Sequence, residues 1–384
     1  MRCEHLGLTN FRNYARLELD LPPGVTVLQG DNAQGKTNFL DAIHIVATTR
    51  SARSAPEREW INWLAFEDPL PYTRIVAKVR RAASVIQIEM TATLGENGNG
   101  ITKRMKINGA PRRSVDVIGQ VTVVLFSPLD IDLVAGSPSQ RRRYLDIMNA
   151  QVDAKYLRSL QQYNRVLLQR NSLLRLVRDR QAKPDQLAYW DLQLADLGAY
   201  VVDRRRDAVE ALNTLAQDIH PALTGRQEFL HVAYRPNFGG DTPEPLPSRA
   251  DLPTRLLAAI QTARAREIAQ GVSLVGPHRD DLQFTTDGID TTVYGSRGQQ
   301  RTAALALKLA EAQFIRERTG DSPILLLDDV MSELDSRRRR QLLSSIRPEQ
   351  QVIFTATDLE DFDPSFLARA TILRVKSGRI EKAH

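Results

Sequence analysis

Near its start the chain carries the segment Gly30-Asp31-Asn32-Ala33-Gln34-Gly35-Lys36-Thr37. This segment fits the pattern G-x-x-x-x-G-K-[ST] of the phosphate-binding loop, in which backbone N–H groups surround the phosphates of a nucleotide. In that pattern Lys36 reaches the β- and γ-phosphates, and the hydroxyl of Thr37 holds Mg²⁺. The segment therefore predicts a nucleotide-binding site, with Asn38 at the start of the following helix.

The residues on either side of the loop favour this interpretation over a chance match. Residues 25–28 are apolar or β-branched and predict a short buried strand before the loop. Residues 38–46 predict a helix after it, whose N-terminus would point at the bound anion. A strand before the loop and a helix after it are the local structure that this kind of site requires.

A second acidic element completes the expected site. Residues 324–327 are four apolar residues, and Asp328 and Asp329 follow them directly. Ligands of open α/β sheets lie at the carboxyl ends of the strands, where such a pair would lie. We expect Asp328 to bind Mg²⁺, mostly through water, and Asp329 to orient or deprotonate the attacking water. Two acids after a strand can also simply cap a loop, but the phosphate-binding loop requires such a partner. Lys36, Asp328 and Asp329 are therefore the predicted catalytic residues.

The pattern of apolar residues predicts one α/β head that is split by a helical insertion. Apolar residues alternate with polar ones near the start, and residues 75–79, 85–92 and 105–107 predict an antiparallel sheet. The apolar runs at 324–327 and 352–354 are typical of buried parallel strands that share a sheet with the loop strand. We predict residues 1–127 and 262–384 as the two parts of the head, and residues 128–261 as the arm.

The insertion predicts two long helices. From Ser139 to Lys183 there is neither Gly nor Pro, and Leu160, Leu167 and Leu174 recur at intervals of seven. A turn is expected near Pro184, and apolar residues then recur at three- and four-residue steps from 187 to 215. Two such helices with a short connection should pair antiparallel as an arm. A proline-containing loop at 235–253 and a helix from about 252 to 270 should follow. Outside the insertion, residues 95–100 predict a turn.

Composition places limits on the class of protein. The 384 residues include one cysteine, Cys3, which excludes an internal disulfide and suits a reducing compartment. No run approaches 18 apolar residues, and the first residues lack the apolar core of a signal peptide, so we expect a cytoplasmic protein with no membrane partner. The net charge of +6 suggests a polyanionic partner.

The first predicted arm helix is the most basic part of the chain. Residues 141–183 contain eleven Lys or Arg against three Asp, an excess of eight positive charges that exceeds the net charge of the whole chain. Such a helix could follow the phosphates of DNA, although a solvated helix face would show the same bias. The candidate DNA-binding residues are Arg141, Arg142, Arg143, Arg158 and Arg165. A metal nuclease around His278 is disfavoured, because no second acidic cluster accompanies it.

The order of the motifs resembles that of the ATP-binding-cassette ATPases. After the phosphate-binding loop comes Ser296-Arg297-Gly298-Gln299 before a predicted helix, then the strand with two acids, then Asp335. A serine and free N–H groups at a helix N-terminus offer a second anion site, although a plain serine cap would look the same. The resemblance implies that Ser296, Gly298 and Gln299 of one subunit meet the ATP held by the other. It also implies an ATP-dependent head-to-head homodimer, with Ser296 and Asp335 at the interface.

Longer strings resemble one family within this class, the RecF family of bacterial recombination mediators. The strings span most of the chain: Asn10–Tyr14, Gly30–Asn38, Phe126–Pro128, Leu133–Pro138, Arg141–Asp146, Gly276–Leu282, Ser296–Leu309 and Leu325–Asp335. The resemblance implies that Arg12 and Asn13 help to hold the nucleotide. It also implies ATP and Mg²⁺ as cofactors, and action in DNA repair, recombination, replication restart and the SOS response.

The resemblance further implies partners and a slow reaction. The partners would be double-stranded DNA near single-strand gaps and junctions, with RecR and RecO, in loading RecA. Asp329 stands where many cassette ATPases have Glu, and Thr355 to Asp358 replace the histidine after the last core strand, so we expect weak ATP hydrolysis. The position that corresponds to the lid glutamine of this class is not assigned, and Gln120 and Ser127 are the two candidates. A clamp of the structural-maintenance (SMC) type and a transporter subunit are the alternatives, disfavoured by the short insertion and by the basic arm.

Overall fold

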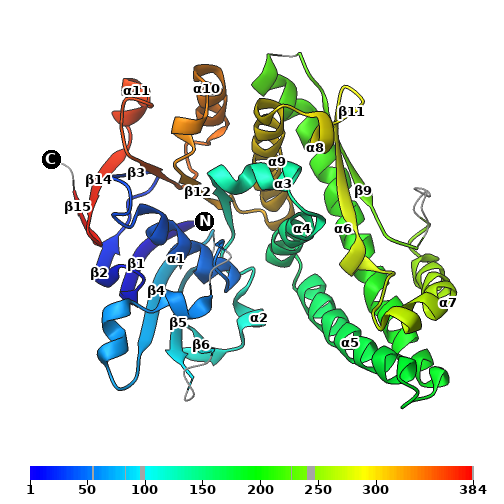
Figure 1. The fold of residues 1–384 in the computed structure, drawn as a ribbon. Coiled ribbons are helices and arrows are strands. Elements are labelled where there is room, and N and C mark those ends of the chain that lie inside the picture. The colour runs from blue at the N-terminus through cyan, green and yellow to red at the C-terminus, as the bar shows by residue number, and fades with distance from the viewer. Residues whose placement is uncertain (54–55, 83, 96–99, 226, 240–246, 383–384) are drawn as a thin grey trace. The chain divides into compact units, whose positions relative to one another are not determined.

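The computed structural model describes residues 1–382 apart from 54–55, 83, 96–99, 226 and 240–246 (Figure 1). The chain forms two compact units. Unit 1 comprises Met1–Asp130, Ala222–Thr224 and Leu305–His384, and unit 2 comprises Ile131–Pro221 and Gly225–Ala304. Unit 2 therefore extends beyond residue 261, and the predicted division into head and arm at 127/128 and 261/262 stays a prediction.

Unit 1 contains a six-stranded sheet in the order β15-β14-β3-β13-β12-β8. Its strands are β3 (Val25–Gln29), β8 (Val123–Phe126), β12 (Ile324–Asp328), β13 (Val352–Ala356), β14 (Thr371–Lys376) and β15 (Arg379–Lys382). All pairs are parallel except β14 with β15. The strand before the phosphate-binding loop thus shares a sheet with the strand that ends in Asp328, as predicted. Parallel strands place their carboxyl ends at one edge, so the two halves of the predicted site meet there.

The second sheet of unit 1 is antiparallel, in the order β2-β1-β4-β5-β6-β7. Its strands are β1 (Arg2–Phe11), β2 (Tyr14–Asp20), β4 (Tyr72–Arg80), β5 (Val85–Leu94), β6 (Ile101–Ile107) and β7 (Ala110–Arg112). This sheet confirms the predicted antiparallel strands. Helix α1 (Lys36–Thr48) packs against it through buried Phe39 and Ile43, which join Leu6, Ile75 and Met90 in one apolar core.

Unit 2 is built from long helices and a three-stranded sheet, β11-β10-β9. Its elements are α3 (Ile131–Ala135), α4 (Pro138–Val152), α5 (Ala154–Arg178), α6 (Leu187–Thr224), β9 (Leu230–Arg235), α7 (Leu252–Gln270), β10 (Asp281–Thr286), β11 (Ile289–Asp290) and α8 (Thr291–Tyr294). Helix α9 (Arg297–Thr319) begins in unit 2 and ends in unit 1. Short helices of unit 1 are α2 (Ser114–Val117), α10 (Ser336–Ser345) and α11 (Pro364–Leu367).

The predicted antiparallel pairing of the two arm helices is confirmed. Arg205 of α6 donates to the hydroxyl of Tyr156 near the start of α5, and Arg170 further along α5 donates to Asp191 nearer the start of α6. Helix α7 joins the pair, and its Leu256 and Ile260 pack with Tyr163 of α5 in one buried cluster. Helix α7 therefore packs against the pair, a contact that the sequence did not predict.

The prediction of one uninterrupted helix over 139–183 is wrong, because the helix is broken at Asp153. Asp153 ends α4 and begins α5, with an extended backbone (φ −139°, ψ 100°). Its side chain accepts hydrogen bonds from the N–H groups of Lys155 and Tyr156, at 2.8 and 2.9 Å. An aspartate is a strong N-cap, so it can start a new helix without any Gly or Pro.

The other predicted connections are partly described. The turn near Pro184 is present as a short 3₁₀ helix over Pro184–Gln186, and the helix expected from about 252 to 270 is α7. Within the proline-containing loop, residues 240–246 lie outside the described residues, as do residues 96–99 of the predicted turn at 95–100.

Candidate nucleotide site

The phosphate-binding loop needs its glycine at position 35. Gly35 has φ 117°, a conformation that side chains with a Cβ rarely adopt, and Ala33 is also left-handed at φ 64°. A Cβ on Gly35 would lie 2.5 Å from the amide nitrogen of Asn13. Helix α1 begins at Lys36, so the loop passes directly into the N-terminal turn of a helix, where free N–H groups and the helix dipole favour an anion.

Lys36 is held over the loop rather than extended into solvent. Its ammonium donates to the carbonyl oxygen of Asp31 at 2.9 Å and to the carbonyl oxygen of Gly30. Burial lowers the pKa of Lys36, and the carboxylates of Asp329, Asp328 and Asp31 act in the opposite direction. The lysine charge is thus placed at the loop and faces three carboxylates of the same site.

Thr37 and Asp328 are brought together by the fold, although 291 positions separate them in the chain. The hydroxyl of Thr37 donates to a carboxylate oxygen of Asp328 at 2.8 Å. The hydroxyl of Thr355, at the end of β13, donates to the same oxygen at 2.9 Å. A hydroxyl and a carboxylate side by side are oxygen ligands of the kind that Mg²⁺ prefers.

Asp329 has the geometry of a fixed turn residue. Its backbone is left-handed at φ 52°, and its N–H donates to the Thr355 hydroxyl at 2.9 Å. Ser332 donates to its carbonyl oxygen at 2.9 Å. Burial raises the pKa of the Asp329 carboxyl, and Lys36 opposes this effect. A raised pKa makes Asp329 a stronger base than an ordinary aspartate.

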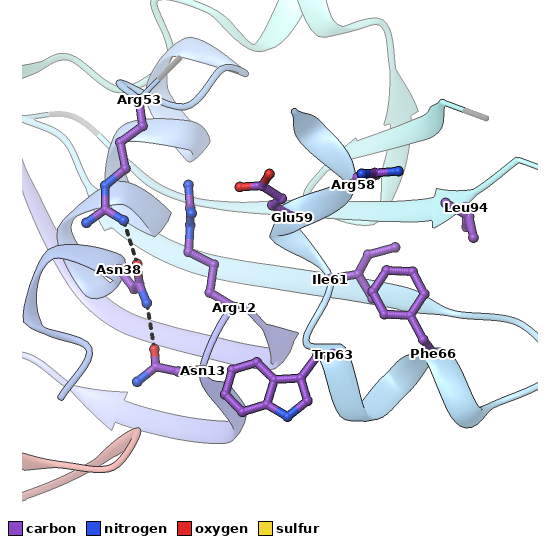
Figure 2. Close-up of a pocket in the computed structure, with 10 residues that line it drawn as sticks. All are labelled: Arg12, Asn13, Asn38, Arg53, Arg58, Glu59, Ile61, Trp63, Phe66 and Leu94. Carbon is purple, nitrogen blue, oxygen red and sulfur yellow. Dashed lines mark hydrogen bonds between the residues drawn. The ribbon is translucent and has the colours of Figure 1, made fainter. Parts of the chain in front are cut away.

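Asn13, from the turn between β1 and β2, is tied to the loop. Its amide donates to the carbonyl oxygen of Gln34 at 2.9 Å, and the amide of Asn38 donates to Asn13 at 2.8 Å. Figure 2 shows Asn13, Asn38 and Arg12 along one side of a pocket of about 520 Å³. Arg53, Arg58, Glu59, Ile61, Trp63, Phe66 and Leu94 complete the lining. The pocket is large enough for a small ligand and adjoins the end of the phosphate-binding loop.

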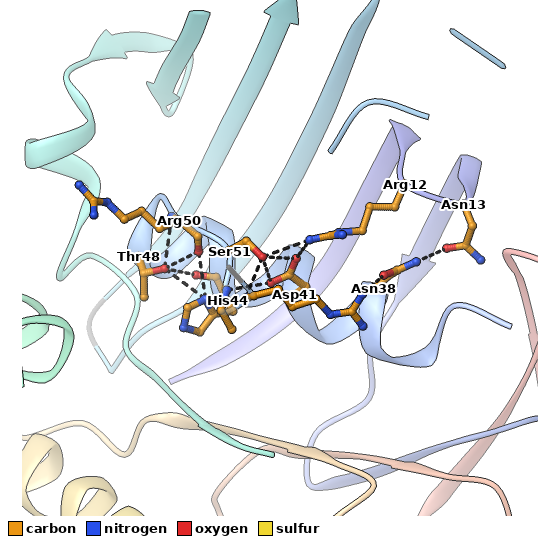
Figure 3. Close-up of polar contacts among 10 residues, drawn as sticks. Arg12, Asn13, Asn38, Asp41, His44, Thr48, Arg50 and Ser51 are labelled. Carbon is orange, nitrogen blue, oxygen red and sulfur yellow. Dashed lines mark hydrogen bonds and ion pairs between the residues drawn. The ribbon is translucent and has the colours of Figure 1, made fainter. Parts of the chain in front are cut away.

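Arg12 is fixed by α1 and the residues after it (Figure 3). Its guanidinium donates to Asp41 at 2.5 Å and to the hydroxyl of Ser51 at 3.1 Å, and Ser51 donates to Asp41 at 2.9 Å. The side chains of Arg12 and Asp41 are both buried, while the Nε atom of Arg12 has no hydrogen-bond partner within the described residues. Arg12 thus lies in the pocket wall with its direction set by Asp41.

Ser296 caps helix α9 in unit 2. Its hydroxyl accepts from the N–H of Gln299 at 3.2 Å, and its own N–H donates to the Gln299 side chain at 2.9 Å. This reciprocal pair of hydrogen bonds is a capping box, so Ser296 acts as an N-cap of the helix in this structure. Ser296 and Gly298 are both exposed, and the capped helix N-terminus therefore remains open to a ligand or a partner.

Asp335 caps another helix, α10 of unit 1. It accepts from the N–H of Arg338 at 2.9 Å and forms an ion pair with the Arg338 guanidinium at 2.7 Å. The hydrogen bond from the Arg338 N–H is the main cause that lowers the pKa of Asp335. The exposed carboxylate is thus ionised and oriented at the helix start, and its place at a dimer interface stays a prediction.

Gln120, one of two candidates for the lid residue, lies on the wrong side of the sheet. It precedes β8, whereas Asp328 is at the carboxyl end of β12, and β8 and β12 are parallel. Gln120 is therefore at the opposite edge from the nucleotide site. Phe126 pairs with Leu327, which places Ser127 beside Asp328 at the correct edge.

The candidate DNA-binding arginines differ in exposure. Arg141 is buried and forms a two-bond ion pair with Asp281 at 2.6 and 2.8 Å, so it supports unit 2 instead of offering a surface charge. Arg142 is half-buried and donates to the carbonyl oxygen of Asp280. Arg143, Arg158 and Arg165 are exposed, and for them DNA contact stays a prediction.

The segment around His278 serves the core of unit 2. The Nδ1 atom of His278 forms a hydrogen bond of 2.6 Å with the hydroxyl of Tyr163. Burial lowers the pKa of His278 to about 4. Asp280 is buried against Arg205 and Tyr234. Among the described residues, no group of three or more His, Cys, Asp or Glu could hold a metal ion, and no helix has the length and apolarity to span a membrane.

Comparisons with known proteins identify the family. The model of the RecF/RecN/SMC N-terminal domain family matches residues 2–365. The DNA replication and repair protein RecF of Chloroflexus aurantiacus is 45% identical over 392 residues, covering 99% of each chain. The chain belongs to the RecF family. RecF of Roseiflexus castenholzii is 44% identical over 396 residues, covering 100% of each chain.

Solved structures agree with this family and its fold. The structure of the recombination mediator protein RecF with ATP in the RecFOR pathway has a TM-score of 0.88 and 31% identity, and the match covers 100% of this chain and 97% of that one. An SMC head bound to the C-winged helix domain of ScpA has a TM-score of 0.56 at 14% identity, which shows a shared fold. The predicted α/β cassette-type ATPase head with an inserted helical arm is confirmed.

Four residues of the site were not predicted. Thr355 holds Asp328 and Asp329, Asp41 directs Arg12, and the backbone of Ser377 and Gly378 donates to the side chain and carbonyl oxygen of Gln34. Thr355 is the penultimate residue of the buried strand β13, at the edge that carries the site, and that position was a usable signal. Asp41 lies inside a helix among apolar residues, where a buried acid requires a cationic partner.

Replacing Thr355 by Val should loosen the acidic side of the site without a large change in volume. The change removes the hydroxyl that donates to Asp328 and accepts from Asp329. Loss of such a supporting partner typically lowers metal affinity or activity about 10- to 100-fold. ATP hydrolysis measured over a Mg²⁺ titration should therefore show a lower maximum or a higher metal requirement. Thr357→Val at an exposed position of the same segment is the control, and equal behaviour of the two variants would contradict the assigned role.

Proposed function

We propose that this chain is an ATP-dependent DNA-binding recombination mediator that acts in DNA repair and replication restart. The observation that carries the proposal is the joining of Thr37, Asp328 and Thr355 at the end of a phosphate-binding loop, in a chain of the RecF family. The name of the relatives, DNA replication and repair protein, and the ATP in the solved RecF structure support the nucleotide and the process.

The residues present fit ATP and Mg²⁺. The loop N–H groups and Lys36 would hold the phosphates, and Thr37 and Asp328 would hold the metal, which supplies charge neutralisation at the phosphates. Thr355 keeps Asp328 directed at that position. Asn13, Asn38 and Arg12 extend the same wall into the neighbouring pocket, which supports their place in nucleotide binding.

Hydrolysis would be weak and would act as a switch. Asp329 accepts a proton from the attacking water or orients that water, and its raised pKa favours the first role. The aspartate is one methylene shorter than the glutamate of many cassette ATPases, so its hold on the water is less direct. We expect slow turnover that times the release of DNA.

The nucleotide site described here would be half of a working site. In the proposed scheme, Ser296, Gly298 and Gln299 of a second copy close over the nucleotide, and Asp335 lies in the interface. The exposed N-terminus of α9 supports this scheme, because its N–H groups and dipole favour phosphate oxygens. The closed homodimer would hold duplex DNA near single-strand gaps, through exposed arm residues such as Arg158 and Arg165.

Further partners follow from the family. RecO and RecR would act with this chain to help load RecA, as the RecFOR pathway of the solved relative suggests. A cytoplasmic location stays a prediction. An SMC-type clamp would need far longer arms, and α6, the longer helix of the pair with 38 residues, extends only about 57 Å at about 1.5 Å per residue. No observation favours a transporter subunit.

Ser296→Arg tests the dimer directly. The bulky side chain should leave ATP binding intact, because the phosphate-binding loop is unchanged, and should block closure by steric conflict at the partner's site. Light scattering with ATP should show a dimer for the unchanged protein and a monomer for the variant. Ser172→Arg, at an exposed position on α5, should still dimerise. If Ser296→Arg dimerises at the same ATP concentration as the unchanged protein, Ser296 does not lie in the interface.

A further inference from the structure

A row of arginines and threonines crosses the antiparallel sheet of unit 1 on one face. Thr9 of β1 is the register partner of Arg16 on β2 and of Arg74 on β4. Arg74 pairs with Thr91 on β5, and Thr91 pairs with Arg104 on β6. Directly paired residues point to the same face of a sheet, so five neighbouring side chains read Arg-Thr-Arg-Thr-Arg (strands in Figure 1).

This row lies on the solvent face of the sheet. The residues next to it in sequence, including Leu8, Leu17, Ile75 and Met90, are buried and point to the opposite face, where α1 packs. Arg16, Arg74 and Arg104 are exposed. The sheet therefore presents a line of three guanidinium groups with hydroxyl groups between them.

The charge of the row is only partly neutralised. Arg74 forms an ion pair with Glu89 at 3.1 Å. Within the described part of the chain, Arg16 and Arg104 have no side-chain hydrogen bond or ion pair. The acidic residues Glu18 and Glu89 of this face belong to the next row of paired residues, and Asp20 lies one row further along β2 beside His5. Like charges in one row repel each other, so the row does not stabilise the sheet. Its positive charge instead favours the binding of a polyanion.

We infer that this solvent face is a binding surface for the phosphate backbone of duplex DNA. Neighbouring strands are about 4.8 Å apart, so Arg16 and Arg104 are separated by about 19 Å. Over that length a duplex carries roughly eleven phosphate charges, at about one per 1.7 Å. Arginine and threonine side chains are usual donors to phosphate oxygens.

Duplex DNA fits the row better than other polyanions do. Surfaces that bind single strands without sequence preference use aromatic side chains on which bases stack, and the row has none. An acidic protein segment would also match the charge, but the relatives are named as DNA replication and repair proteins. The inference rests on the proposed DNA-binding function, but it requires neither ATP nor a dimer, because the whole row belongs to one unit of one chain.

The test is the salt dependence of duplex binding by the double variant Arg16→Gln/Arg104→Gln. Each phosphate contact contributes about 0.9 to the slope of log affinity against log salt concentration, so the slope should fall by about 1.8. Fluorescence anisotropy with a labelled duplex of mixed sequence gives this slope. The control Arg369→Gln/Arg379→Gln removes the same charge from exposed positions elsewhere in unit 1 and should keep the original slope. Arg16→Lys/Arg104→Lys should largely keep it as well.

The measurement is made without ATP and repeated with Lys36→Met in all variants, so that failure of the ATP scheme leaves the result readable. Nucleotide binding and the thermal unfolding temperature of Arg16→Gln/Arg104→Gln show that its fold is retained. An unchanged slope in that variant overturns the inference. An equal fall in the control overturns it too, because the effect is then one of net charge. Loss of binding to polyglutamate with an unchanged DNA slope assigns the face to an acidic protein and also overturns it.

Discussion

Lys36→Met is expected to abolish ATP binding and ATP-stimulated DNA retention together. The Lys36 side chain is buried at the loop, and its ammonium can neutralise the phosphates. Removing one partner of a buried charged contact costs about 2–5 kcal/mol, which is roughly 30- to 5,000-fold in affinity. Methionine keeps most of the side-chain length, so the loop retains its packing.

Two assays separate this effect from general damage. Equilibrium binding of a fluorescent ATP analogue reports the nucleotide site, and retention of gapped duplex DNA with and without ATP reports the coupling. Lys382→Met removes an exposed charge from β15 and should behave as the unchanged protein does. ATP-stimulated DNA binding that survives in Lys36→Met would show that the stimulation does not pass through this loop.

Asp329→Asn is expected to trap the ATP-bound dimer on DNA. The amide keeps the size of the side chain but cannot accept a proton, and loss of a general base typically lowers a rate about 10²- to 10⁴-fold. Binding should survive, because Thr37, Asp328 and Lys36 are unchanged. Slower turnover, together with longer residence on gapped duplex, is the combination that the switch requires. Asp185→Asn in an exposed turn is the control.

The pH dependence of the unchanged protein gives a second readout for the same residue. Burial raises the pKa of Asp329, so its basic form is lost as the pH falls through that raised value. The profile of kcat/KM should therefore have an acid limb above the range of an ordinary aspartate, and Asp329→Asn should lack this limb. Turnover by Asp329→Asn at the rate of the unchanged protein would remove the assigned role.

A nuclease is a different function, and one experiment distinguishes it from a DNA clamp. Labelled gapped duplex with Mg²⁺ and ATP should stay intact, because the acids around His278 are engaged in the core of unit 2. Cleavage that depends on the protein would contradict a clamp that only holds DNA.

The sequence predicted that the parts of the candidate nucleotide site meet, because each part has a local signature. The loop at 30–37 and the strand that ends in Asp328 are continuous motifs, and buried parallel strands are recognisable as apolar runs. Their meeting at one sheet edge then follows from the geometry of parallel strands. The contact of Thr37 with Asp328 is therefore predictable, even though the two residues are far apart in the chain.

Other features depend on long-range partners that no local pattern contains. Arg141 and Arg170 contributed to the charge count of the arm, yet both are buried in ion pairs, with Asp281 and with Asp191 and Glu267. A count of charges cannot show burial, because the acids that neutralise them lie elsewhere in the chain. The helix break at Asp153 was missed for a different reason. A capping aspartate resembles any polar helix residue until its side chain is seen to accept from Lys155 and Tyr156.

In the proposed scheme, ATP joins two copies of this chain on DNA. Analytical sedimentation of the protein alone, with ATP, and with ATP and gapped duplex DNA can detect this assembly. We predict a monomer without ATP, a dimer with ATP, and a dimer bound to gapped duplex when both are present. A species that remains a monomer under all three conditions would contradict the scheme.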